Sequence, residues 1–212
     1  MSGPNELLVE GSDDLHVIRN LLLVVGHRLE ERDHKVIDKQ GVENLLDAIP
    51  VMLKDVERRV LAVVLDADED VSARWQAVCA RVRRAIPDAV LPLTPDPAGT
   101  VVFLPDGRRF GAWLMPDNQL GGMLEDFLKL LVPSTDLLFE HADTFVGGIP
   151  VGARLFGAKE AKAKLHAWLA VQADPGRPLG VAVTARVLDP SRPSAAAFVE
   201  WLRRAWLAPA EG

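Results

Sequence analysis

The sequence predicts an α/β fold, in which a mostly parallel sheet carries helices on both faces. Two observations lead to this prediction. Short apolar runs at residues 7–9 and 63–65 both stop at acidic residues or glycine, which is typical of buried parallel strands. Segments with helical periodicity separate such runs, and a βαβαβαβ order requires right-handed crossovers that place helices on both sides of a sheet.

The first 95 residues supply these alternating elements. Ser12 is the expected N-cap of the first helix, and Asp13 and Asp14 in its first turn complement the helix dipole. Gly41 opens the second helix, which we expect Pro50 to disturb. The expected strands are residues 7–9, 34–38, 59–65 and 90–93, and the expected helices are residues 12–28, 42–53 and 71–86.

The composition changes at Thr94-Pro95-Asp96-Pro97, and the pattern that follows predicts a hairpin and then helices. Pro105-Asp106-Gly107 is a turn sequence between two apolar runs. Residues 179–187 fit either a strand or a buried loop. The expected strands are residues 100–104 and 108–115, and the expected helices are residues 121–132, 135–145, 159–171 and 195–207.

We therefore divide the chain into an α/β core, residues 1–95, and a hairpin and helical extension, residues 96–212. No flexible linker is long enough to separate the two parts, so we expect the extension to pack with the core as one compact body.

Composition limits the classes of protein to which the chain can belong. It has 212 residues, a net charge of −6 and one cysteine, Cys79. One cysteine excludes an intramolecular disulfide and a cysteine-rich zinc finger, and it fits a reducing cytoplasm. The apolar stretches are far shorter than the roughly 20 residues that span a bilayer, and the N-terminal residues lack a signal-peptide pattern, so we expect a cytoplasmic protein without a membrane segment.

Acidic residues follow two of the expected strands. Glu10 comes directly after the first, and Asp66 and Asp68 come after the third. Taken singly, each of these residues is typical of a solvated acid in a loop. However, the carboxyl ends of parallel strands meet at one edge of a sheet, where ligands bind. Carboxylates gathered there need a cation or raised pKa values, and hard oxygen ligands suit Mg²⁺.

These residues resemble the motifs of the Toprim domain, which topoisomerases, bacterial primases, a ribosomal-RNA maturase and OLD-type nucleases share. The resemblance rests on Val9-Glu10-Gly11 and Leu65-Asp66-Ala67-Asp68 and covers roughly residues 5–95. It implies that Glu10 is a general acid/base and that Asp66 and Asp68 hold Mg²⁺ or Mn²⁺, with Glu10 as a further ligand. Asp14 matches an additional acid of the OLD-type version and is a further candidate metal ligand. Its alternative role is a charge at a helix N-terminus.

Residues and motifs that the chain lacks exclude several of the Toprim subfamilies. The chain has no tyrosine to act as a topoisomerase nucleophile, too few cysteines for a primase zinc module, and no Gly-x-x-x-x-Gly-Lys loop for an ATPase domain. What remains is similar to small stand-alone Toprim-like proteins of uncharacterised function. Residues 113–118 and 122–128 are similar to an uncharacterised bacterial and archaeal group of these proteins.

Other charged residues are weaker candidates. Glu125, Asp117 and Asp70 are candidates for a second metal site, but Asp117 also fits a turn, Glu125 an arginine pair and Asp70 the start of a helix. Lys162 and Lys164 match a lysine that OLD-type nucleases use downstream of the aspartate pair. Sequence alone does not choose between them, and a solvated basic helix face is the alternative.

The leading function is therefore a Mg²⁺-dependent phosphodiesterase or nuclease, or a phosphotransfer enzyme, that acts on nucleic acid. The net charge argues against coating nucleic acid by charge alone, but bound cations would offset it in a nuclease. The alternative is a catalytically silent module that binds nucleic acid, a nucleotide or a partner protein. A homodimer and a separate ATPase or other protein partner both stay open.

Overall fold

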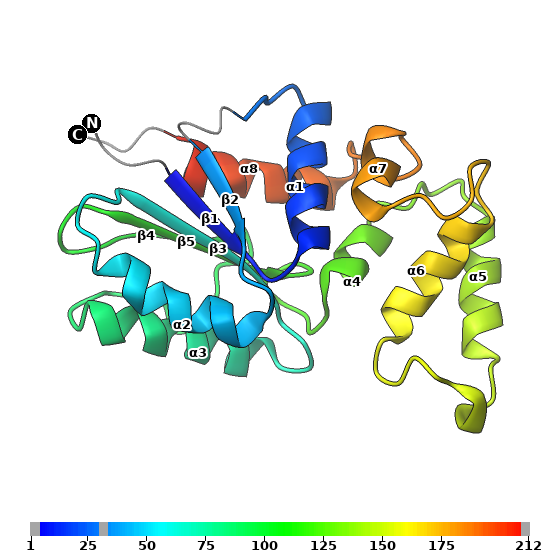
Figure 1. The fold of residues 1–212 in the computed structure, drawn as a ribbon, viewed down its shortest axis with the longest axis horizontal. Helices are drawn as coiled ribbons and strands as arrows, with labels where there is room; N and C mark the ends of the chain where they lie inside the picture. The colour runs from blue at the N-terminus through cyan, green and yellow to red at the C-terminus, as the bar shows by residue number, and fades with distance from the viewer. Residues whose placement is uncertain (1–4, 30–33, 209–212) are drawn as a thin grey trace.

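A five-stranded sheet runs through the centre of the molecule (Figure 1). The computed structural model describes residues 5–29 and 34–208. Within them the strand order is β2-β1-β3-β5-β4, and only β4 at one edge is antiparallel to its neighbour. The strands are β1 (Asn5–Val9), β2 (His34–Asp38), β3 (Val60–Asp66), β4 (Thr100–Phe103) and β5 (Arg109–Met115).

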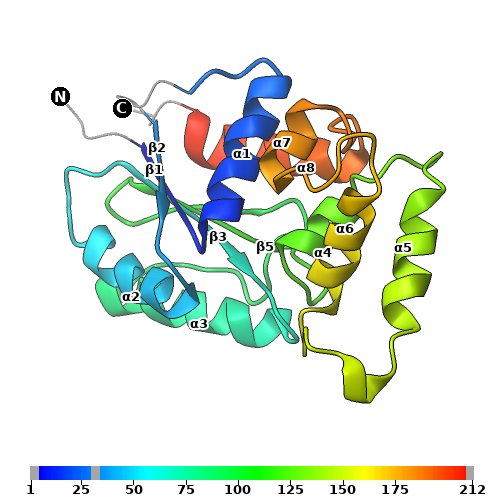
Figure 2. The ribbon, with the colours of Figure 1, turned by 45° about the vertical axis from the view of Figure 1, so that its right-hand side comes forward.

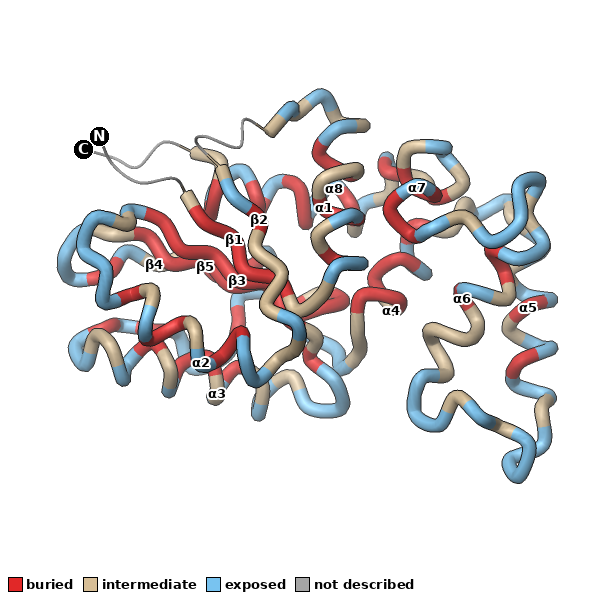
Figure 3. The backbone as a smooth tube through the Cα atoms, in the orientation of Figure 1, coloured by how far each residue is buried: buried red, intermediate tan, exposed pale blue. Residues whose placement is uncertain are grey.

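Both faces of the central strands are buried (Figure 3). Val60, Ala62 and Val64 of β3 face one hydrophobic cluster, while Leu61 and Val63 face a second cluster on the opposite side of the sheet. A strand that is covered on both faces has to be apolar at consecutive positions, which explains the unbroken Val/Leu run.

Helices cover each face, as the sequence predicted (Figure 1). On one face lie α2 (Val42–Leu53) and α3 (Val71–Ala85), and on the other lie α1 (Ser12–Val24), α8 (Pro193–Leu202) and a π-helical segment (Arg203–Leu207). The α/β class, the mostly parallel sheet and the single compact body are thus confirmed. None of the helices among the described residues is long and apolar enough to cross a membrane.

The remaining helices extend the molecule at the carboxyl end of the parallel strands (Figures 1 and 2). They are α4 (Leu124–Lys129), α5 (Leu138–Gly147), α6 (Glu160–Ala170) and α7 (Leu179–Thr184), with a 3₁₀ turn at Val151–Ala153. The α5 and α6 helices pack against each other, and α7 packs against α1. Gly180 permits that second contact, because a Cβ atom there would lie 2.9 Å from the His16 carbonyl oxygen of α1.

Two expected elements were wrong. Residues 90–93 form no strand, since Val90 and Leu93 are 83% and 96% exposed and β5 occupies the place beside β3. Residues 179–187 contain helix α7 instead of a strand or buried loop. In both segments the short apolar run was compatible with several structures, and packing against the rest of the chain decided between them.

Smaller differences concern helix ends. Gly11, not Ser12, is the N-cap residue of α1, and the helix includes Ser12. Pro50 lies inside α2 without ending it. The last expected helix begins at Pro193, and its final five residues are π-helical.

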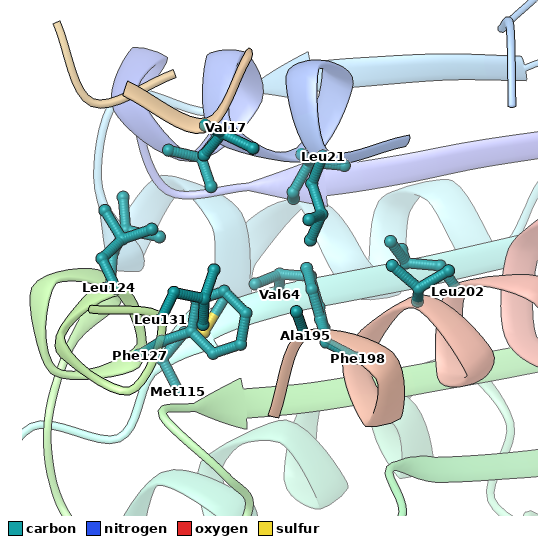
Figure 4. Packing of buried hydrophobic residues seen from close by; sticks show 14 of the residues in the cluster. Val17, Leu21, Val64, Met115, Leu124, Phe127, Leu131, Ala195, Phe198 and Leu202 are labelled. Atoms are coloured by element: carbon teal, nitrogen blue, oxygen red, sulfur yellow. The ribbon is translucent and has the colours of Figure 1, made fainter. Parts of the chain in front are cut away.

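The packing between α8 and the sheet gives a stability prediction (Figure 4). Phe198 is fully buried, and its ring lies 5.1 Å from that of Trp113 and 5.2 Å from that of Phe127 between centroids. Phe198→Ala should lower the free energy of unfolding by about 3–5 kcal/mol, because it leaves a cavity.

Phe145→Ala is the matched control, since Phe145 is 69% exposed, and we expect a change of no more than about 0.5 kcal/mol. Urea denaturation followed by circular dichroism measures both variants. If Phe198→Ala lowers the free energy of unfolding as little as Phe145→Ala does, Phe198 is not part of the core.

Candidate functional site

Four carboxylates lie close together at the carboxyl edge of the parallel strands. Glu10 follows β1, Asp66 ends β3, Asp14 is in the first turn of α1, and Glu125 is in the first turn of α4. Asp66 is electrostatically coupled to the other three, and Asp14 is coupled to Glu10 and Glu125. We call these four residues the carboxylate cluster.

Backbone hydrogen bonds hold three of these side chains in place. The Asp66 N–H donates to Glu10 Oε1 at 2.8 Å, which ties the end of β3 to the residue after β1. The Leu124 N–H donates to Asp66 Oδ1 at 2.9 Å, and the Gly11 N–H donates to Asp14 Oδ2 at 3.1 Å. Each bond uses one carboxylate oxygen and leaves the other for a further ligand.

Burial makes the cluster electrostatically unfavourable. Asp14 and Glu125 are only 8% and 5% exposed. Desolvation, followed by repulsion from neighbouring carboxylates, raises the pKa of Asp66 to about 8 and that of Asp14 to about 7. Desolvation also raises the pKa of Glu10. Such a group of acids is stabilised either by bound protons or by a cation.

Lys162 of α6 is the lysine that meets the cluster. Its Nζ lies 3.1 Å from Glu125 Oε1 and 3.3 Å from Asp13 Oδ2. Partial burial lowers the pKa of Lys162, but the two carboxylates outweigh this effect, and the pKa is raised overall. Lys164 points elsewhere, with its Nζ 3.0 Å from Asp143 and 2.8 Å from Glu160.

Asp68 lies at the margin of the cluster. Its charge adds only slightly to the desolvation that raises the pKa of Glu10, and Arg74 has the opposite effect. The half-exposed carboxylate of Asp68 forms an ion pair with Arg74. Its backbone has a φ of 52°, and its N–H donates to the Gly122 carbonyl at 2.9 Å. Gly121 allows this close approach, because a Cβ there would lie 2.6 Å from the Asp68 carbonyl oxygen.

Asp70 and Asp117 have local structural roles. The Asp70 carboxylate accepts a hydrogen bond from the Ala73 N–H at 3.0 Å and caps α3. The Asp117 carboxylate accepts from the N–H groups of Gln119 and Leu120 at 3.0 and 2.8 Å, and so closes a turn. Neither side chain, nor that of Asp68, is among the carboxylates that, after desolvation, raise the pKa of Asp66.

The donor atoms of the cluster fit a hard cation. Mg²⁺ binds through one or two carboxylates and keeps several waters, so it does not need a closed shell of protein ligands. In the part of the chain that the structure describes, no three His, Cys, Asp or Glu side chains already converge as a metal-ligand group. A cation would therefore be held by a few of these oxygens and by water.

Sequence reasoning missed Arg74 and the groove that it lines. This groove has a volume of about 870 Å³ and runs past Asp68 and Asp126. The sequence did contain an indication of Arg74. It lies four residues after the helix cap Asp70, and one turn of α3 places its side chain near the acidic loop that precedes the helix.

A family model covers almost the whole chain. The model described as "Protein of unknown function (DUF3226)" matches residues 4–207. The chain belongs to the DUF3226 family. Neither the curated proteins nor the solved structures gave a match. The description of DUF3226 assigns no activity, so the function of this member has to be argued from its carboxylate cluster.

The raised pKa values predict how the stability of this DUF3226 protein depends on pH. The pKa of Asp66 is about 8 in the folded chain and near 3.8 without the fold, so the folded state binds more protons between these values. Without divalent cations, the free energy of unfolding should therefore fall as the pH rises from about 4 to about 8.

Asp66→Asn should reduce this slope, because the amide takes up no proton. Urea titrations in EDTA at several pH values measure how the free energy of unfolding depends on pH. Asp88→Asn is the control, since Asp88 is exposed and lies outside the cluster. A slope that Asp66→Asn leaves unchanged would contradict the pKa assignment.

Proposed function

We propose that this DUF3226 protein is a Mg²⁺- or Mn²⁺-dependent phosphodiesterase that acts on nucleic acid. The observation that carries the proposal is the carboxylate cluster, buried at the edge of a parallel sheet and beside a groove. Open α/β sheets bind ligands at this edge. The resemblance of Glu10, Asp66 and Asp68 to Toprim motifs supports the same assignment.

The cluster and the neighbouring Asp68 each have a role in this proposal. Asp66 would hold the cation, joined by Asp68 once it leaves Arg74, and the cation would supply Lewis acidity toward the scissile phosphate. Glu10 moves a proton at the attacking water or the leaving oxygen, and its raised pKa brings it nearer to neutral pH, where a proton-transfer group is most effective. Asp14 and Glu125 add negative charge that favours cation binding.

Lys162 balances the negative charge on the side of α6. Its ammonium group contacts Glu125, one residue from the Leu124 N–H that holds Asp66. A positive charge at this place can stabilise the charge that develops on the phosphate during cleavage. Both lysines pair with two carboxylates, but the partners of Lys164 are Asp143 and Glu160, and neither belongs to the carboxylate cluster.

A catalytically silent module is the second candidate. The observation in its favour is that no ready group of three metal-binding side chains exists among the described residues. Such a module would use the same acids to bind nucleic acid, a nucleotide or a partner protein without turnover.

Asp66→Ala should abolish metal-dependent cleavage. Removing a ligand that contributes several kcal/mol to the transition state lowers the rate by a factor on the order of 100 or more. The measurement is cleavage of single- and double-stranded DNA and RNA in Mg²⁺ and Mn²⁺, with Asp88→Ala as the control.

Equal cleavage by Asp66→Ala and wild type would refute the enzyme proposal. Cation-dependent retention of nucleic acid without cleavage by wild type would instead support the silent module.

The two lysines offer a matched pair. Lys162→Ala should lower the cleavage rate about 10- to 100-fold, because it removes a charge beside the reacting phosphate. Lys164→Ala, two residues away on the same helix, should change the rate by less than about threefold. Initial rates at saturating Mg²⁺ compare them, and a larger loss in Lys164→Ala would reverse the assignment.

A further inference from the structure

The groove beside the carboxylate cluster lies between the start of α3, the turn before α4 and the start of α6. Most of the residues that line it are alanine or glycine, which leaves its floor open. Its charged lining residues are Asp68, Glu69, Asp70, Asp126 and Arg74. Four acids and one base make the groove repel a phosphate group as long as no cation is bound.

Arg74 is the single basic residue among the described residues that line the groove. Its guanidinium pairs with Asp68, a side chain that the site also needs for the cation. Arg74 Nε is buried and has no hydrogen-bond partner within the described part of the chain, so the guanidinium has an unused donor. The α3 helix holds Arg74 in place from a capped first turn.

We propose that Arg74 is a phosphate-binding residue. Its guanidinium pairs with Asp68 until a cation binds to Asp68 and releases it. This inference rests on the proposed function, because it requires a cation at Asp66 and Asp68. Cation binding draws the Asp68 carboxylate away from Arg74, and the freed guanidinium then binds a phosphate of a nucleic-acid strand in the groove.

Charge explains why the exchange favours the ligand. A divalent cation offsets two of the acids, and the release of Arg74 turns an internal ion pair into a free positive charge. Guanidinium and phosphate match in a two-pronged hydrogen-bond geometry. Asp68 can leave Arg74 because its side chain is 54% exposed, whereas the Arg74 side chain is only 14% exposed and therefore needs a new partner, which the phosphate supplies.

This arrangement makes phosphate binding dependent on the cation. In the cation-free groove, Asp68 and Arg74 neutralise each other, and Glu69, Asp70 and Asp126 repel the ligand. Cation and strand should therefore bind with positive cooperativity, since each stabilises the arrangement in which Asp68 has left Arg74.

Two measurements on the full chain test the inference. Isothermal titration calorimetry gives the affinity for Mn²⁺ alone, and fluorescence anisotropy gives the affinity for a phosphorothioate oligothymidylate of about ten nucleotides at saturating Mn²⁺. Arg74→Ala should weaken oligonucleotide binding about tenfold, because a charge-assisted contact is lost. Its Mn²⁺ affinity should increase, because Asp68 no longer has to leave Arg74 to bind the cation.

Arg74→Lys keeps the charge, should retain part of the oligonucleotide affinity, and serves as the test if the alanine variant does not fold. Arg81→Ala is the matched control on the same helix, since Arg81 pairs with Asp47 at 3.2 Å and does not line the groove. It should change neither affinity.

The outcomes separate the two proposals. An Arg74→Ala protein with unchanged oligonucleotide affinity, or with unchanged or weaker Mn²⁺ binding, would overturn the role of Arg74 alone. Wild-type protein that binds no Mn²⁺ would overturn the proposed function as well. Tighter Mn²⁺ binding together with weaker oligonucleotide binding is the result that supports the exchange.

Discussion

The parallel pairing of β1, β3 and β5 is the constraint on which the site depends. It aligns Leu8 with Val63 and Asp66 with Met115, so the three strands end at the same edge of the sheet. The hydrogen bond from the Asp66 N–H to Glu10 extends this alignment into the side chains. Because the neighbouring strands are locked by buried apolar faces, the acids cannot relax away from one another by a shift of register.

This alignment is energetically unfavourable for the carboxylates. Their desolvation and mutual repulsion oppose folding at neutral pH, and hydrogen bonds from Gly11 and Leu124 offset only a part of that. Because these acids lower the stability of the fold, their presence at this edge is better explained by the binding of a ligand than by a contribution to stability. A cation or a bound proton supplies the missing positive charge.

The later part of the chain completes the site from a distance in sequence. Helix α4 brings Glu125 and the Leu124 N–H to the end of β3, and α6 brings Lys162 to Glu125. The sheet alone would leave the acids open to solvent. Asp126 of α4 and Ala161 of α6 also line the groove, together with Arg74 of α3.

The sequence by itself determined the features that depend on neighbouring residues. Residues 34–38 and 42–53 were predicted with the bounds that the structure has, since strand and helix periods are local properties, and the acids after β1 and β3 could be placed at one edge from topology alone. Tertiary structure decided which strand lies beside β3, that residues 179–184 form a helix on α1, and which lysine meets Glu125. It also decided that Asp68 pairs with Arg74. These choices depend on burial and on charges from distant segments, and no pattern within a short stretch of sequence records them.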